Sequence, residues 1–136
     1  MTEKIERLPG SLELAFLGDT IYDFYIRRHL LVAGGSMKQL QLSASRRVCA
    51  HAQAMALGGI EHMLLQEELD VVRRVRNAKQ HPPKNANPAE YHRATGLEAL
   101  LGWLYIQGRE ERIDQLMCEI LAHMEEILHK GDTEHA

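Results

Sequence analysis

Three carboxylates lie in stretches of the chain that are otherwise apolar. Asp19 and Asp23 lie in "LAFLGDTIYDFYI" (residues 14–26), and Glu98 lies in "ATGLEALLGWLY" (residues 94–105). On a helix, side chains three and four residues apart share a face, and neither Asp19 nor Glu98 has a basic residue at those positions. An isolated carboxylate in apolar surroundings is costly. Another group of the protein, or a ligand, must therefore offset these charges.

A shared cation would offset both charges at once. If the two helices cross at Gly18 and Gly102, the missing side chains let the backbones approach and bring Asp19 close to Glu98. Two neighbouring carboxylates repel unless they share a proton or a cation. Mg²⁺ suits a site of one or two carboxylates that water and phosphate oxygens complete. The alternative is that each acid accepts a local N–H or pairs with an arginine, because structural ion pairs also explain many buried acids.

The basic residues are concentrated in one segment. The chain has a net charge of −3, yet residues 73–93 contain six basic residues and one acid, against 10 basic and 18 acidic residues elsewhere. Such a segment on an acidic body is typical of a contact with a polyanion, although a charge run can equally be a solvated loop. The six are Arg73, Arg74, Arg76, Lys79, Lys84 and Arg93.

Helical periodicity dominates the chain, and no stretch alternates with period two, so we predict an all-α fold. The 136 residues, 45% hydrophobic and 26% charged, fit one globular domain, which we place at residues 1–130 with a frayed tail over 131–136. The predicted N-caps are Ser11, Ser36 and Asn87, the last with Glu90 as a capping-box acid. The glycine pair at 58–59 should end a helix. The predicted helices span residues 12–32, 36–57, 66–78, 88–107 and 109–130, with a loop at 79–87.

The remaining features point to a soluble intracellular protein. No apolar run reaches the ~18 residues that span a membrane, and the first residues lack the apolar core of a signal peptide, so we expect a cytoplasmic protein. Cys49 and Cys118 lack zinc-site spacing and are interpreted as reduced thiols. The eight histidines lack the geometry of a metal centre and are expected at the surface.

Four segments resemble the ribonuclease III domain, specifically its short Mini-ribonuclease III branch. They are "LAFLGDTIYDFYIRRHL", "VVRRVRNAKQ", "PKN" and "EYHRATGLEALLGWLYIQGREERI". The resemblance covers residues 8–127 and implies an all-helical, homodimeric, Mg²⁺-dependent endonuclease without a separate RNA-binding domain. It also implies cleavage of double-stranded RNA, in this branch the precursor of large-subunit (23S) ribosomal RNA, with 5′-phosphate and 3′-hydroxyl products.

The resemblance assigns catalysis and metal binding to Asp19 and Glu98. Larger members of the family carry further acids at positions that hold Leu12, Ala15 and Thr95 here, so the metal site should be weaker and more hydrated. The short branch shares this reduced set. Thr95, together with Asp23, could hydrogen-bond a metal-bound water. The reduced set also favours a rival interpretation, a non-catalytic dimer that binds double-stranded RNA, and a small helical protein with no RNA role is a weaker one.

The resemblance also predicts the RNA contacts and the dimer interface. We expect modest, salt-dependent affinity for RNA, and selection of the substrate through RNA shape or a partner such as a ribosomal protein. The resemblance assigns aromatic residues of the first helix to the dimer interface, and the alternative is that they pack in the core of a single chain. The predicted RNA-binding residues are Arg76, Asn77, Lys79 and Lys84, supported by Arg73, Arg74 and Arg93, and the predicted interface residues are Phe16, Tyr22, Phe24 and Tyr25.

Overall fold

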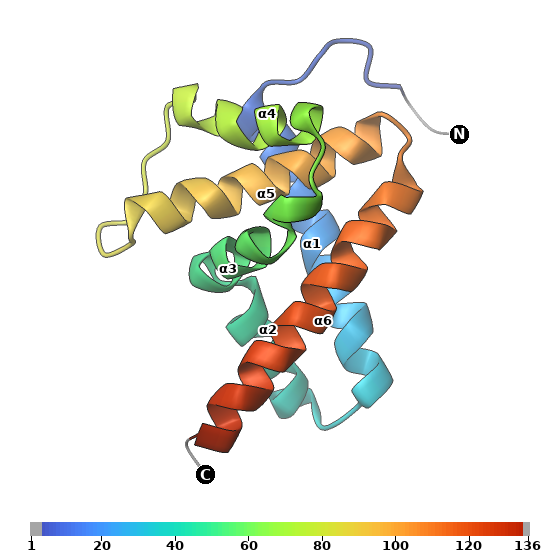
Figure 1. Cartoon of the computed structure of the whole chain (residues 1–136), viewed down its shortest axis with the longest axis vertical. Helices are drawn as coiled ribbons and strands as arrows, with labels where there is room; N and C mark the ends of the chain where they lie inside the picture. The colour runs from blue at the N-terminus through green and yellow to red at the C-terminus, as the bar shows by residue number, and fades with distance from the viewer. Residues whose placement is uncertain (1–3, 135–136) are drawn as a thin grey trace.

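The structure is all-helical, as predicted. This computed structural model describes the backbone of residues 4–134 and the side chains of residues 4–128, and no strand occurs in the described part of the chain. Two short 3₁₀ turns, Glu61–Met63 and Val75–Asn77, follow α3 and α4. The helices are α1 (Ser11–Ala33), α2 (Met37–Val48), α3 (Ala50–Ile60), α4 (Gln66–Arg74), α5 (Pro88–Ile106) and α6 (Glu110–Glu134) (Figure 1).

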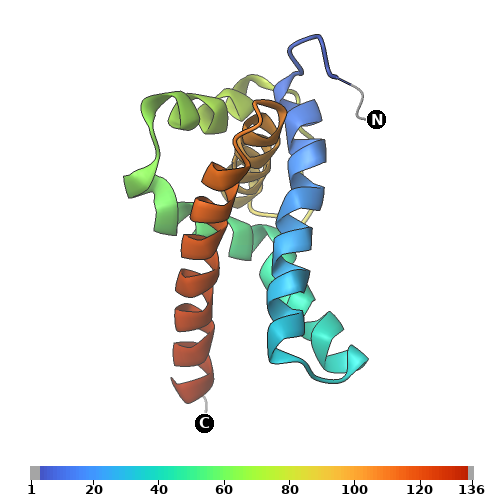
Figure 2. The same cartoon turned by 90° about the vertical axis from the view of Figure 1, so that its right-hand side faces the viewer.

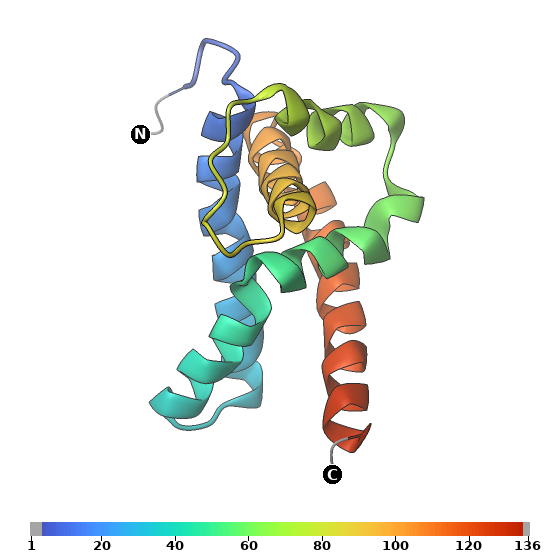
Figure 3. The same cartoon turned by 90° about the vertical axis from the view of Figure 1, so that its left-hand side faces the viewer.

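Helix α5 forms the centre of the fold. Figure 3 looks along it and shows α1, α3, α4 and α6 arranged around it, and α5 packs against all four. A helix that is apolar on every face belongs in a core, and the side chains of Leu97, Leu100, Leu101 and Leu104 are fully buried. The long helices α1 and α6 extend beyond this core, where α2 packs on α1 (Figure 2).

Two of the three predicted N-caps are confirmed. The Ser36 hydroxyl accepts from the Gln39 backbone N–H at 3.2 Å, and the Gln39 side chain accepts from the Ser36 N–H at 2.9 Å. Asn87 Oδ1 accepts from the two backbone N–H groups at Ala89 and Glu90, at 2.9 and 3.2 Å. These caps fix the start of α2 and, with Pro88 at the first helical position, the start of α5.

Two cap predictions are wrong. Ser11 lies inside α1, whose N-cap is Gly10, and the Gly10 N–H donates to Glu13 Oε1 at 3.1 Å. The side chain of Glu90 does not complete a capping box and pairs instead with His51. Glu13 thus caps the start of α1 one residue earlier than predicted, and a contact with the distant residue His51 replaces the predicted local hydrogen bond of Glu90.

The predicted helix over residues 36–57 is two helices. Cys49 adopts extended backbone angles, φ −69° and ψ 159°, which separates α2 from α3. The pair Gly58–Gly59 does not end α3, which continues to Ile60. A Cβ atom on Gly59 would lie 2.5 Å from His123 Cδ2, so this glycine serves close packing against α6.

The ends of two other helices also differ from the prediction. Helix α4 ends at Arg74 and a 3₁₀ turn replaces its predicted last residues. Helix α6 continues to Glu134, beyond its predicted end at residue 130; residues 135 and 136 lie outside the described range, and the frayed tail stays a prediction. No helix in the described part of the chain is long and apolar enough to cross a membrane.

A buried ion pair fixes α4 against α6. Arg112 donates from Nε to Glu68 Oε2 at 2.8 Å and from Nη2 to Glu68 Oε1 at 2.7 Å, and Glu68 is fully buried. Burial disfavours the Glu68 charge, but hydrogen bonds from Arg112 and the Leu65 N–H outweigh burial and lower the pKa of Glu68. This pair positions the helix that carries Arg73 and Arg74.

Candidate active site

The glycines of α1 and α5 meet where the two helices cross, as the sequence predicts. A Cβ atom built on Gly18 would lie 1.6 Å from the Glu98 carbonyl oxygen, and one on Gly102 would lie 2.0 Å from the Leu14 carbonyl oxygen. No side chain fits in either space, because even a methyl group would overlap the backbone of the facing helix. This contact sets the distance between the residues that flank the glycines.

Asp19 and Glu98 lie within hydrogen-bonding reach of each other across this crossing. The pKa of Glu98 is raised to about 8, first by burial, and then by the hydrogen bond and negative charge of Asp19. Without a cation, the pair therefore holds one shared proton at neutral pH. The side chain of Asp19 is exposed, so solvent and a phosphate group can approach the pair from that side.

Arg27 on α1 and Arg93 on α5, the two helices that carry the acid pair, are bound to other carboxylates. Arg27 Nε lies 2.9 Å from Oδ2 of Asp23, and Asp23 is one turn after Asp19 on α1. Arg93 pairs with Glu61, which follows α3. No ion pair or hydrogen bond between an arginine and Asp19 or Glu98 is found in the described part of the chain, so the ion-pair interpretation does not account for these two acids.

Gln53 is a third residue at this site, which sequence reasoning missed. Its side chain is 4% exposed, and it donates a hydrogen bond to Glu98 that partly opposes the raised pKa. Gln53 lies on α3, so three helices position the acid pair. A signal was present in the sequence, since "AHAQAMAL" (residues 50–57) places one amide on an apolar helix face.

The side chains at the crossing fit a hydrated divalent cation. Two carboxylates that share a proton would also share a cation, and their oxygens are the ligands that Mg²⁺ prefers. Among the described residues no cluster of three or more histidine, cysteine or acidic side chains could hold a metal. Most ligands of a cation bound here would therefore be water and phosphate oxygens.

Thr95 and Asp23, the two predicted helpers, both have protein partners. The Thr95 hydroxyl is buried, donates to the Tyr91 carbonyl oxygen at 2.9 Å, and accepts from Gln80 Nε2 at 2.8 Å. Asp23 accepts from Arg27, as described above. The Thr95 hydroxyl proton and one Asp23 oxygen are therefore engaged within the protein, and a contact of either side chain with a metal-bound water stays a prediction.

The 79–87 loop, which carries the predicted RNA-binding residues Lys79 and Lys84, is fixed to α5 through Gln80. Gln80 Nε2 donates to Thr95 Oγ1, and His92 Nδ1 lies 2.5 Å from Gln80 Oε1. Thr95 is one turn before Glu98, so this contact places the loop beside the acid pair. The predicted RNA-binding residues themselves, Arg73, Arg74, Arg76, Asn77, Lys79, Lys84 and Arg93, are all exposed.

Comparison with known proteins identifies the family of this chain. The profile of the Ribonuclease III domain family matches residues 12–109. The chain belongs to that family. Within it, the chain is 46% identical to Mini-ribonuclease 3 of Symbiobacterium thermophilum, over 78% of this chain and 83% of the relative. It is also 46% identical to Mini-ribonuclease 3 of Brevibacillus brevis, over 87% and 90%. These matches confirm the Mini-ribonuclease III branch.

A solved structure has the same fold. The crystal structure of protein FN1578 from Fusobacterium nucleatum superposes with a TM-score of 0.76 at 32% identity, covering 85% of this chain and 95% of that one. The helices described above are thus the ribonuclease III fold, and membership of the family makes the chain an endoribonuclease of the ribonuclease III type.

Part of the apolar surface of α1 is not covered by the rest of the chain. The side chains of Phe16 and Phe24 are 84% and 57% exposed, and Tyr25 is half-buried with its hydroxyl donating to the Asp114 carboxylate. Tyr22 was wrongly predicted to lie at the interface. It is fully buried, and its hydroxyl donates to the Arg47 carbonyl oxygen at 2.7 Å, so it belongs to the core of one chain.

Proposed function

We propose that this protein is a Mg²⁺-dependent endonuclease for double-stranded RNA in which Asp19 and Glu98 bind the metal. The observation that carries the proposal is the acid pair itself: two carboxylates from α1 and α5 that share a proton and have no arginine partner. Repulsion between two neighbouring carboxylates lowers the stability of the fold. A bound cation would relieve this repulsion, so a role in cation binding explains why the two acids lie together.

The residues around the acid pair have distinct tasks. Asp19 and Glu98 would both bind the cation when ionised, and the Gln53 amide holds the Glu98 carboxylate in place. Mg²⁺ bound there would supply a Lewis acid that lowers the pKa of a water and offsets charge on the scissile phosphate. The exposed residues of segment 73–93 that were predicted to bind RNA would hold its backbone, because duplex RNA is recognised chiefly through its phosphates and 2′-hydroxyls.

The substrate we propose is the precursor of large-subunit (23S) ribosomal RNA. The names of the relatives support a Mini-ribonuclease III activity, and attack by water on the phosphate would leave 5′-phosphate and 3′-hydroxyl ends. A ribosomal protein could present the cleavage site by fixing the shape of the RNA. We also propose that the protein acts in the cytoplasm.

We further propose that the active form is a homodimer joined through α1. A duplex has two strands, and two-fold symmetry supplies two acid pairs related as the strands are. Phe16 and Phe24 are the candidates for the interface, because large exposed apolar side chains along one helix face mark an association site. Phe16→Glu should give a monomer by light scattering, and a dimer of unchanged affinity would refute the α1 interface.

Cleavage of a duplex segment from the ribosomal precursor tests the function. Asp19→Asn should abolish Mg²⁺-dependent cleavage while binding in EDTA persists. The matched control is Glu119→Gln, which neutralises an exposed acid on α6 and should cleave normally. Binding by the unaltered protein without any cleavage would instead indicate the non-catalytic RNA-binding dimer, and mapped product ends would test the predicted end chemistry.

A further inference from the structure

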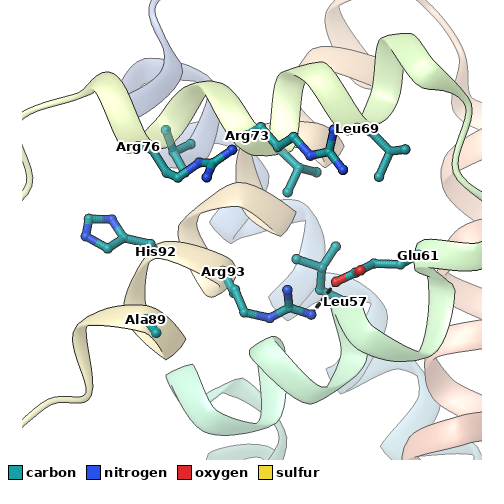
Figure 4. Close-up of a pocket in the computed structure, with 10 residues that line it drawn as sticks. Leu57, Glu61, Leu69, Arg73, Arg76, Ala89, His92 and Arg93 are labelled. Carbon is teal, nitrogen blue, oxygen red and sulfur yellow. Dashed lines mark hydrogen bonds and ion pairs between the residues drawn. The ribbon is translucent and has the colours of Figure 1, made fainter.

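We propose that a cavity between α4 and α5 binds one unpaired nucleotide of the RNA substrate. The cavity has a volume of about 380 Å³, which lies at the lower end of the ~300–1,000 Å³ typical of small-ligand sites. Three of the predicted RNA-binding residues, Arg73, Arg76 and Arg93, line it (Figure 4), and neither acid of the pair is among its lining residues. The inference rests on the proposed function, because it takes double-stranded RNA as the source of the nucleotide.

The polar side chains of the cavity favour a phosphate group. Arg73 and Arg76 lie along one wall and Arg93 lies across from them (Figure 4). The one acid among the lining residues is Glu61, which Arg93 already neutralises. Guanidinium groups match phosphate oxygens with paired hydrogen bonds, so the cavity attracts an anion with oxygen acceptors.

The apolar side chains that line the cavity favour a base as well as a phosphate. Leu57, Leu69, Val72 and Val75 line it, and a simple phosphate ion would gain nothing from such a surface. An aromatic base would cover these side chains and could stack on an arginine plane, as unpaired bases do in many RNA complexes. A phosphate next to an aromatic base is a nucleotide.

The shape of the cavity excludes a paired base. Bases inside a duplex are stacked on their neighbours, and a recess between two helices cannot receive them without extrusion. A bulged or terminal nucleotide needs no such disruption. The position also fits RNA, since His92 lines the cavity and contacts Gln80 of the basic loop. The cavity is therefore continuous with the surface expected to follow the backbone.

The test compares two RNAs that differ by one unpaired nucleotide. Binding of a fully paired duplex and of the same duplex with a single bulged adenosine is measured by fluorescence polarisation in EDTA. The unaltered protein should bind the bulged duplex about tenfold more tightly, because base stacking is worth ~1–3 kcal/mol per base. Adenosine 5′-monophosphate should weaken binding of the bulged duplex more than inorganic phosphate does.

Neighbouring arginines supply a matched pair of variants. Arg73→Gln removes a charge that lines the cavity and should reduce the preference to below about twofold. Arg74→Gln removes an equal charge from the next residue, which does not line the cavity, and should weaken both RNAs equally while the preference remains. Leu69→Phe fills the cavity without changing charge and should also abolish the preference, provided that circular dichroism shows an unchanged helical fold.

Two results would overturn the inference: equal affinity of the unaltered protein for the two RNAs, or the same change in preference for Arg73→Gln and Arg74→Gln. Adenosine 5′-monophosphate binding that depends on Arg73, with no preference between the RNAs, would also overturn the inference for RNA and would indicate a site for a free nucleotide instead. Because binding is measured without metal, failure of the cleavage reaction would leave these results unaffected. A failure here would likewise leave the acid pair intact as the proposed centre of cleavage.

Discussion

Replacing Glu98 by glutamine should stabilise the metal-free protein, and by an amount that grows with pH. The pKa of Glu98 is about 8 in the folded protein and near its ordinary value of 4.5 in the unfolded chain. Between these values the unfolded state releases a proton that the folded state keeps, so stability falls as pH rises through this window. Glutamine has no proton to release, so Glu98→Gln removes this decrease in stability at higher pH.

The size of the effect follows from the two pKa values. The difference between about 8 and 4.5, at ~1.4 kcal/mol per pH unit, corresponds to ~5 kcal/mol. This is an upper bound, because water reaches part of the Glu98 side chain. The variant and the unaltered protein should be nearly equal in stability at pH 5, and their difference should be largest at pH 8.5.

Urea unfolding in EDTA at a series of pH values measures this difference. Trp103, the chain's single tryptophan, is 8% exposed in the folded protein and reports unfolding by its fluorescence. Protein concentration must stay fixed, because dimerisation would contribute to stability. Glu119→Gln, which removes an exposed acid of α6, should follow the pH profile of the unaltered protein.

Adding Mg²⁺ provides the second half of the experiment. At pH 8.5 a cation bound by both carboxylates should restore stability to the unaltered protein, by ~1.4 kcal/mol at ten times its dissociation constant. Glu98→Gln should gain much less. Parallel pH profiles for the two proteins in EDTA would refute the shared proton, and equal responses to Mg²⁺ would refute Glu98 as a ligand.

Three further perturbations test the elements that position the site. Gly18→Ala should destabilise the protein by ~3 kcal/mol or more in urea unfolding, because its Cβ would lie 1.6 Å from the Glu98 carbonyl oxygen; a change below ~1 kcal/mol would show that α1 and α5 can move apart freely. Arg112→Met leaves the fully buried Glu68 without its partner and should cost ~3–5 kcal/mol, whereas the double variant with Glu68→Leu should recover most of that loss. Gln53→Leu removes the hydrogen bond that lowers the pKa of Glu98, so the rise of cleavage rate with pH at low Mg²⁺ should move to higher pH; an unmoved profile with a lower rate would indicate a purely structural role.

The residues alone leave the acid pair as one of two interpretations, and the resemblance to the ribonuclease III domain favours it over an ion pair with an arginine. A carboxylate without a basic residue on its own helix face must meet its partner elsewhere, and glycines at 18 and 102 mark a place where two helices can approach. The capping box at Ser36 and the cap at Asn87 were predictable because their hydrogen bonds close within three residues.

The residues that sequence reasoning missed depend on contacts between distant segments. Gln53 meets Glu98 only because α3 packs on α5, and Gln80 reaches Thr95 and His92 only after the loop has folded back. Periodicity identifies an apolar face but not what covers it, which is why Tyr22 was assigned to an interface although α2 buries it and accepts its hydroxyl.

The close crossing of α1 and α5 bears on the proposed cation site, which has only two carboxylates. With the backbones in contact at Gly18 and Gly102, neither Asp19 nor Glu98 can move away along its helix without breaking the core on either side. Their repulsion is therefore held in the fold, and only a proton or a cation relieves it. Fewer ligands should weaken the site, but fixed ligands lose less freedom when they bind, so the geometry of the crossing compensates in part for the reduced number of acids.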